Sequence, residues 1–414
     1  MLVNKEYKTN VGILFIYIYI LLSYIGKQEI MDEQWQSLSL YLLLGVCLLT
    51  ILYFGRFRIV QYHIWYISFI CLSLISCLYA LNTLEAFNKI YSLFVVLGLT
   101  IAISTLLKST EEIKKVIVCF SASGFLLFVL LSVTNQLLVS ERLGESLFGN
   151  ANVFAVIVML AAMCSIWLVV YDVGFKKYIY LAFLATEFYM LFLSGGRKYI
   201  LVSALFLYLL LIFKKDKKGK SKKIQYTVLF IVIVAIGYWA LFNIPQLYNI
   251  VGYRMESMLS LFSGEGQNKL PEDMIRENMI LYGLGFFAQR PLLGYGTDSF
   301  TLLFGEAYGR YTYSHNNFVE ILVNNGLVGF VVYYLFYIVL VYKLWIIQGD
   351  HTKLRDFFLA FMVCLLPLEM GVVSYNMYFI HVFISLGSVY LHLESTRTHH
   401  SPSFSVNEDL DVTG

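Results

Sequence analysis

Charged side chains are scarce in this chain of 414 residues: Asp, Glu, Lys and Arg together make up 14% of it, against about 25% in soluble globular domains. Prolines number only five, while hydrophobic residues reach 59%. The net charge of +3 is too small to predict nucleic-acid binding, and the basic residues stand in short clusters at the ends of apolar runs. This composition excludes a soluble enzyme and predicts a polytopic membrane protein.

Metal-ligand spacings, Gly-rich phosphate loops followed by Lys, and nucleophile-elbow patterns are absent from the sequence. All the cysteines fall inside apolar runs, where Cys packs as a small hydrophobe: Cys47, Cys71, Cys77, Cys119, Cys164 and Cys364. We therefore predict no disulfide framework, no metal site and no cofactor.

Apolar runs long enough to approach a bilayer thickness recur along the chain. The runs are continuous and not alternating, which predicts an all-α fold with about twelve transmembrane helices. They cover residues 11–25, 36–54, 62–81, 89–107, 113–133, 151–170, 178–194, 199–213, 224–243, 327–347, 357–374 and 377–393.

Lys and Arg in the short loops predict the orientation, because cytoplasmic loops are enriched in both. One side collects Lys5, Lys8, Arg56, Arg58, Lys108, Lys114, Lys115, Lys176, Lys177, the lysines of 214–223, Lys343, Lys353, Arg355 and Arg397. Both termini are then cytoplasmic. We predict one transmembrane domain, 1–393, with a large outer loop, 244–316, that carries a short amphipathic helix around MILYGLGFFAQR. Residues 394–414 have the composition of a disordered cytoplasmic tail.

Arginine and lysine divide unequally between the two sides. Six of the ten arginines fall outside, against four of the twenty lysines; these arginines are Arg142, Arg197, Arg254, Arg276, Arg290 and Arg310. Arg binds phosphate bidentately, whereas Lys is a flexible point charge. The pattern predicts a phosphorylated, membrane-borne ligand; the alternative is that these arginines pair with outer carboxylates or lipid head groups.

His315 is the one histidine placed at the outer surface. A neutral imidazole beside arginines suits a general base, because nearby positive charge lowers its pKa. The alternative is a histidine at the start of a helix that caps it or hydrogen-bonds to the backbone. Glu187, Glu369 and His381 are ionisable groups within predicted spans and so are functional candidates; the roles of Glu187, Glu369 and the loop residue Asp298 stay open.

Four segments together resemble the O-antigen ligase and O-antigen polymerase superfamily, which are integral-membrane glycosyltransferases of GT-C type. They are RLGESLFGNANVFA (142–155), SGGRKYILVSALF (194–206), RENMILYGLGFFAQRPLLGYGTDSF (276–300) and SHNNFVEILVNNGLVGFVVYY (314–334). In this family a glycan on a polyprenyl diphosphate is transferred to an acceptor hydroxyl at the outer leaflet. The hairpin departs from the family where Gly195 and Gly196 replace a second small polar residue.

The resemblance implies roles for individual residues. Arg197 and Arg276 would clamp the diphosphate, and His315 would accept the proton of the acceptor hydroxyl. We expect the substrate-binding residues to be Arg142, Arg254, Arg290 and Asn316. No metal is required where guanidinium groups carry the charge.

The most specific interpretation is a multi-pass protein of the bacterial inner membrane that polymerises repeat units of O-antigen or capsule on undecaprenyl diphosphate. The resemblance implies membrane lipids, a chain-length regulator and a flippase of the same pathway as partners. A ligase that transfers the glycan to lipid A core or to protein is the alternative within the family. A secondary transporter or lipid exporter is the alternative from another class, since twelve spans suit it as well.

Overall fold

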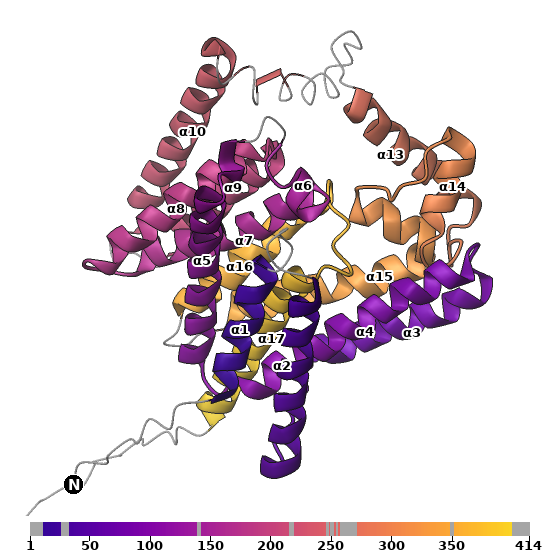
Figure 1. Cartoon of the computed structure of the whole chain (residues 1–414), viewed down its shortest axis with the longest axis horizontal. Coiled ribbons are helices and arrows are strands. Elements are labelled where there is room, and N and C mark those ends of the chain that lie inside the picture. Colours follow the sequence, from indigo (N-terminus) through magenta and orange to yellow (C-terminus); the bar gives the residue numbers. More distant parts are fainter. Residues whose placement is uncertain are drawn as a thin grey trace, which may run out of the picture.

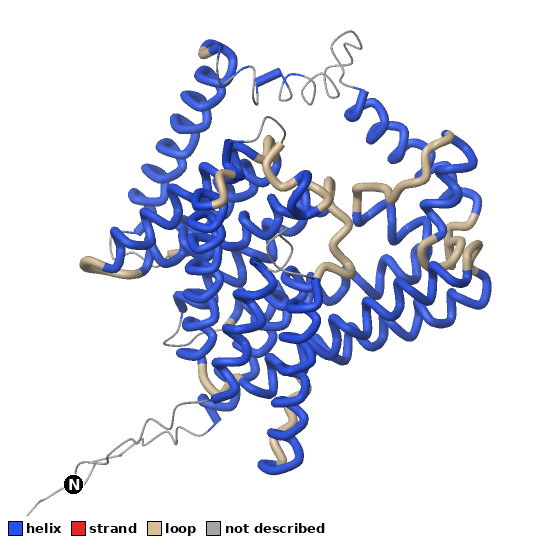
Figure 2. The backbone as a smooth tube through the Cα atoms, in the orientation of Figure 1, coloured by secondary structure: helices blue, strands red, loops and turns tan. Residues whose placement is uncertain are grey.

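The computed structural model describes residues 11–25, 33–138, 142–214, 219–245, 271–347 and 352–399, together with isolated positions between 248 and 256. Across these ranges the regular structure is helical throughout, and no strand occurs in them (Figure 2). The apolar runs explain this outcome, because a helix satisfies every backbone hydrogen bond within one segment. The all-α prediction is confirmed.

A helix lies over each of the twelve predicted apolar runs. They are α1 (Val11–Ile25), α2 (Glu33–Phe54), α3 (Gln61–Ser76), α4 (Thr83–Leu106), α5 (Thr110–Val133), α7 (Ala151–Tyr171), α8 (Lys176–Leu193), α9 (Arg197–Phe213), α10 (Gly219–Asn243), α15 (Asn317–Ile346), α16 (Thr352–Glu369) and α17 (Tyr378–His399). Seven helices of the described chain are long and apolar enough to cross a membrane: α2, α3, α4, α5, α7, α10 and α15. The others are shorter or carry more polar residues.

Helix α7 lies at the centre of the bundle. Its sequence, ANVFAVIVMLAAMCSIWLVVY, has no charged residue and many small ones, so neighbours can pack on every side. Helices α5, α8 and α9 all contact it, and Figure 1 shows α16 beside it in the same bundle. Phe154 and Trp167 are fully buried near its two ends.

Two polar layers lie at opposite ends of α7, which is 21 residues long and therefore spans about 30 Å. At its start, Asn150 donates to the hydroxyl of Tyr313 at 3.4 Å. At its end, Lys114 pairs with Asp172 at 3.1 Å, and Tyr171 donates to Asp356 at 2.6 Å. Tyr313, in the predicted outer loop, and Lys114, predicted to be cytoplasmic, are thus separated by the length of one helix.

The segment between α10 and α15 contains two further helices, α13 (Pro271–Gln289) and α14 (Ser299–Tyr308). They pack on the first part of α15 (Figure 1) through a small core of their own, formed by Met279, Tyr295, Phe300, Phe304, Val319 and Val323. The predicted short amphipathic helix around MILYGLGFFAQR is therefore part of a longer one, α13.

Helix α15 is broken at Gly326, whose φ of +65° is not helical. The loop after α13 fills the break: the backbone N–H groups of Tyr295 and Gly296 donate to the carbonyls of Val323 and Asn324 at 2.9 and 2.8 Å. The predicted span 327–347 corresponds to the part of α15 after this break. The earlier part was not predicted as part of the span, because its polar residues interrupt the apolar run.

The predicted tail begins later than expected. Helix α17 continues to His399, so residues 394–399 are helical, and the prediction of disorder from residue 394 onward is wrong for them. The segment holds no Pro or Gly before Pro402, so nothing in it stops the helix. Residues 400–414 lie outside the described residues.

Candidate functional site

The hairpin between α8 and α9 determines the position of Arg197. Gly195 has a φ of +64°, which residues with a Cβ rarely adopt. A Cβ on Gly196 would lie 2.5 Å from the ring of Tyr199, and the N–H of Gly196 donates to the hydroxyl of Ser194 at 3.3 Å. Both glycines are therefore required by the turn, which presents Arg197 as the first residue of α9.

Arg142 lies against this hairpin. Its Nε donates to the carbonyl of Ser194 at 3.0 Å, and the N–H of Leu143 donates to the carbonyl of Leu193 at 3.2 Å. The segment before α7 is thereby fastened to the turn between α8 and α9. Two of the predicted site arginines, Arg142 and Arg197, are brought together although 55 positions separate them.

Arg197 and Arg276 share one carboxylate. Arg197 donates through one terminal nitrogen to both oxygens of Asp273, at 3.2 and 3.4 Å, and Arg276 lies 3.7 Å from the same carboxylate, one helical turn along α13. Asp273 is buried, with only 3% of its surface exposed. The alternative interpretation, that the outer arginines pair with outer carboxylates, therefore holds for Arg197 and Arg276. The same carboxylate, Asp273, also orients both guanidinium groups.

Lys198 adds a further basic side chain to the group. It follows Arg197 in α9 and donates a hydrogen bond to the carbonyl of Gly371, between α16 and α17. Burial lowers the pKa of its ammonium group well below the ordinary value of 10.5, and the positive charges of Arg276, Arg142 and Arg197 lower it further. Four basic side chains are thus gathered at one end of the bundle, an arrangement suited to a ligand with more than one negative charge.

His315 lies in the short connection before α15 with a φ of +55°, an unfavourable conformation for a residue with a Cβ. Its ring packs on the ring of Tyr313, with centroids 4.1 Å apart. The neighbouring backbone is fixed, since the N–H of Ser314 donates to the buried carboxylate of Glu320 at 2.8 Å. Strain of this kind costs about 1 to 3 kcal/mol and often accompanies function.

The pKa of His315 is lowered from 6.5 to about 3. Burial is the main cause, and the positive charges of Arg276, Lys198 and Arg310 add to it. The imidazole is therefore neutral at physiological pH and able to accept a proton. Arg310, which the sequence placed outside without a role in the site, thus contributes to the same field.

Asn316, predicted to bind substrate, caps α15 in this structure. Its side-chain oxygen accepts from the N–H of Val319 at 3.1 Å, and its carbonyl accepts from the hydroxyl of Ser314 at 2.7 Å. The capping part of the alternative interpretation of His315 is therefore wrong, because the adjacent Asn316 caps α15.

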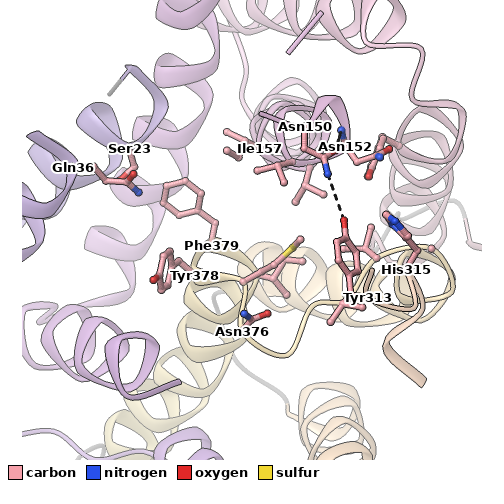
Figure 3. A pocket seen from close by; sticks show the side chains of 18 of the residues that line it. Ser23, Gln36, Asn150, Asn152, Ile157, Tyr313, His315, Asn376, Tyr378 and Phe379 are labelled. Carbon is pink, nitrogen blue, oxygen red and sulfur yellow. Dashed lines mark hydrogen bonds between the residues drawn. The ribbon is translucent and has the colours of Figure 1, made fainter. Parts of the chain in front are cut away.

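A pocket of about 370 Å³ begins at His315 and extends between α7 and the start of α17 (Figure 3). Most of its lining is apolar and includes Val153, Val156, Ile157, Val372, Val373, Met377 and Phe379. Among the polar side chains, Asn150, Tyr313 and His315 lie at one end and Ser23 and Gln36 at the other, with Asn376 between the two ends. Such a cavity fits a ligand with both polar and apolar parts.

Arg290, a predicted substrate-binding residue, is not part of this group. Arg290 is exposed, and its guanidinium carbon lies 4.6 Å from the centre of the Tyr295 ring, a cation–π arrangement. Arg254 lies outside the described residues.

Asp298 is ion-paired with Lys89 at 3.2 Å. Burial raises its pKa above the ordinary value of 3.8, and the charge of Lys89 opposes that rise. Lys89 itself lines the pocket. Asp298 thus has a cationic partner in the structure, whereas His315 stands neutral at the pocket end.

Sequence reasoning missed Lys198 and Asp273 as members of the site. In the sequence, Lys198 belongs to the SGGRK hairpin, and Asp273 is one of several acidic residues in the predicted outer loop 244–316. The position of Asp273 one turn before Arg276 was a usable signal, since residues three apart share a helix face.

Residues 179–334 match the family model described as O-antigen ligase. The matched segment contains the α8–α9 hairpin, Arg276 and His315, whereas Arg142 precedes it. No curated protein matches the chain.

Proposed function

We propose that this chain, in which residues 179–334 match the O-antigen ligase family model, belongs to the O-antigen ligase and polymerase superfamily and polymerises repeat units of O-antigen or capsule on undecaprenyl diphosphate. The observation that carries the proposal is the set of cations, Arg142, Arg197, Lys198 and Arg276, beside a neutral His315 at the end of a partly apolar pocket. The chain is a multi-pass membrane protein of polysaccharide biosynthesis.

In the proposed reaction the acceptor hydroxyl oxygen forms a bond to the anomeric carbon of the donor glycan. The bond from that carbon to the diphosphate breaks, and its electron pair leaves with undecaprenyl diphosphate. The hydroxyl proton passes to the neutral imidazole of His315. No oxidant, reductant or metal enters this balance.

Arg197 and Arg276 stabilise the diphosphate as its negative charge increases in the transition state. Asp273 holds both guanidinium groups in place before the donor arrives, so little reorganisation is needed when it binds. By analogy with oxyanion-hole donors, each arginine contributes roughly 3 kcal/mol to transition-state stabilisation. Arg142 supports this clamp through the hairpin carbonyl of Ser194.

The membrane arrangement is part of the proposal. Twelve spans, both termini in the cytoplasm and a single transmembrane domain up to residue 393 would place the cationic group at the outer leaflet of the bacterial inner membrane. The separation of the two polar layers by the length of α7 supports this arrangement. Donor delivery and control of chain length would then depend on a flippase and a chain-length regulator.

A ligase that transfers the glycan to lipid A core or protein is the second candidate, because the matched family is described as O-antigen ligase. Both reactions need the same diphosphate clamp and the same base. They differ in the acceptor alone.

Deletion in cells distinguishes the two. Loss of a polymerase leaves single repeat units on the usual acceptor and no longer chains, whereas loss of a ligase leaves long chains on the polyprenyl carrier. We expect the first result on gels of surface glycan compared with the lipid-linked pool. Accumulation of long lipid-linked chains would replace the polymerase assignment with the ligase.

A further inference from the structure

Glu369, at the end of α16, is fully buried in the described structure. Its carboxylate accepts hydrogen bonds from the hydroxyls of Tyr334 and Tyr337, each at 2.9 Å, and from the hydroxyl of Ser374. Two of these donors lie on α15, and the third lies in the connection from α16 to α17. One side chain therefore links α15, α16 and the connection between α16 and α17.

Asn317 joins the same network from the first turn of α15. Its amide nitrogen donates to the hydroxyl of Tyr334 at 2.9 Å. Its side-chain oxygen accepts from the backbone N–H groups of Ser374 and Tyr375 at 2.9 and 3.1 Å. The connection from α16 to α17 is thus fastened to α15 at two successive residues.

This connection forms one wall of the pocket, through Gly371, Val372, Val373, Asn376 and Met377. The carbonyl of Gly371 also accepts the hydrogen bond of Lys198, which follows Arg197 in the cationic group.

Asn317 itself lies two positions after His315. The network around Glu369 therefore contacts the site at two places: the pocket wall formed by the α16–α17 connection, and the start of α15 next to His315.

Burying a carboxylate is unfavourable unless hydrogen bonds replace its water. Apolar residues could have packed these helices at no such cost. In a buried polar network, every acceptor needs a donor. When the donors lie on several segments, the network fixes one relative geometry of those segments. That geometry is what a transfer reaction requires, since a displacement of about 1 Å costs roughly 100-fold in rate.

We propose that Glu369 is a positioning residue of the transfer site. It holds the α16–α17 connection against the start of α15, so that the pocket wall, Lys198 and His315 keep their relative positions. This inference rests on the proposed glycan transfer and adds to it a residue that touches neither donor nor acceptor.

The test uses purified, reconstituted full-length protein with an undecaprenyl-diphosphate-linked repeat unit. Glu369→Gln and Tyr334→Phe should each lower turnover at saturating donor by roughly 10- to 100-fold, while the donor dissociation constant stays unchanged because the arginine clamp is intact. The double variant should be no slower than the slower single variant, since both substitutions break one network.

Glu187→Gln is the matched control. Glu187 is equally buried, but it lies on α8 and faces Gly124 of α5. It should leave turnover near that of the wild type. Equal losses in Glu187→Gln and Glu369→Gln would mean a general effect of buried charge and would overturn the inference.

A second measurement does not depend on activity. In a background without the six native cysteines, a cysteine at Asn376 should react faster with a thiol reagent when Glu369→Gln is added, because the connection is released. Unchanged labelling together with wild-type turnover in Glu369→Gln would refute the positioning role. If the wild type transfers no glycan while labelling still responds, it is the proposed function that fails, and the network stands as a structural one.

Discussion

The pKa of His315 is the residue-scale feature on which the mechanism depends. Burial and the cations Arg276, Lys198 and Arg310 hold it at about 3 in the free protein. A bound diphosphate brings negative charge to the same place and therefore raises this pKa again. The imidazole of His315 is thus almost entirely neutral before binding. It becomes a stronger base once the donor is present.

Two pH profiles should consequently differ. Activity requires neutral His315, so kcat/KM for the donor, which reports the free enzyme, should stay constant from about pH 8 down to about pH 5. The profile of kcat, which reports the bound complex, should fall at a higher pH. His315→Ala should lower turnover by about 100- to 10,000-fold. A kcat/KM profile that falls near pH 6.5 would contradict the lowered pKa of His315 in the free enzyme.

Arg197 and Arg276 are expected to act through fork geometry and not through charge alone. Arg197→Lys and Arg276→Lys should each lower transfer by about 100- to 1,000-fold, because an ammonium group cannot make the paired contacts of a guanidinium. The variants should still accumulate in the membrane.

The matched control is Arg290→Lys. Arg290 is exposed and stacks on Tyr295, so this variant should remain close to the wild type. Near-normal transfer in both Arg197→Lys and Arg276→Lys would show that charge suffices and that the clamp is wrong.

At the scale of the helices, the break in α15 explains how α13 comes close to His315. Gly326 interrupts the helix, the loop after α13 binds the released carbonyls of Val323 and Asn324, and α13 packs alongside the first part of α15. Arg276 is carried on α13, so the break positions a clamp residue as well as the loop. The site thus depends on an irregular helix.

Gly326→Ala should therefore destabilise the protein strongly. Its φ is +65°, and an added Cβ would lie 2.3 Å from the carbonyl oxygen of Leu292. We expect a loss of about 3 kcal/mol or more in the free energy of unfolding, seen as a lower Tm in detergent.

Gly309→Ala is the control, because Gly309 also has a positive φ, +82°, but open space around it. It should cost only about 1 kcal/mol. Similar losses in the free energy of unfolding at both positions would show that the close contact at Gly326 does not add to the cost.

Sequence alone located the helices well at the scale of the whole molecule, because hydropathy is a property of each segment by itself. The selection of outer arginines and of His315 by side and residue type included Arg142, Arg197, Arg276 and His315, which the structure gathers, but also Arg290, which it does not. Which outer carboxylate pairs with Arg197 could not be predicted, since the pair joins residues 76 positions apart. The break at Gly326 likewise depends on a loop from another part of the chain.

The orientation of the whole protein can be tested in intact cells. In a background without native cysteines, Glu306→Cys on α14 should react with an impermeant thiol reagent, and Val173→Cys after α7 should react only after permeabilisation. Both positions are exposed, so access depends on the side of the membrane alone. The reverse pattern would place the cationic group in the cytoplasm and end the diphosphate hypothesis.

The central claim, glycan transfer from a polyprenyl diphosphate at this site, is tested most directly with purified protein in sealed liposomes. With an undecaprenyl-diphosphate-linked repeat unit as sole substrate, and without any ion gradient, we predict longer lipid-linked chains and release of undecaprenyl diphosphate, both lost in Arg197→Lys. Movement of the intact lipid across the bilayer with no new glycosidic bond would contradict the account and identify a transporter.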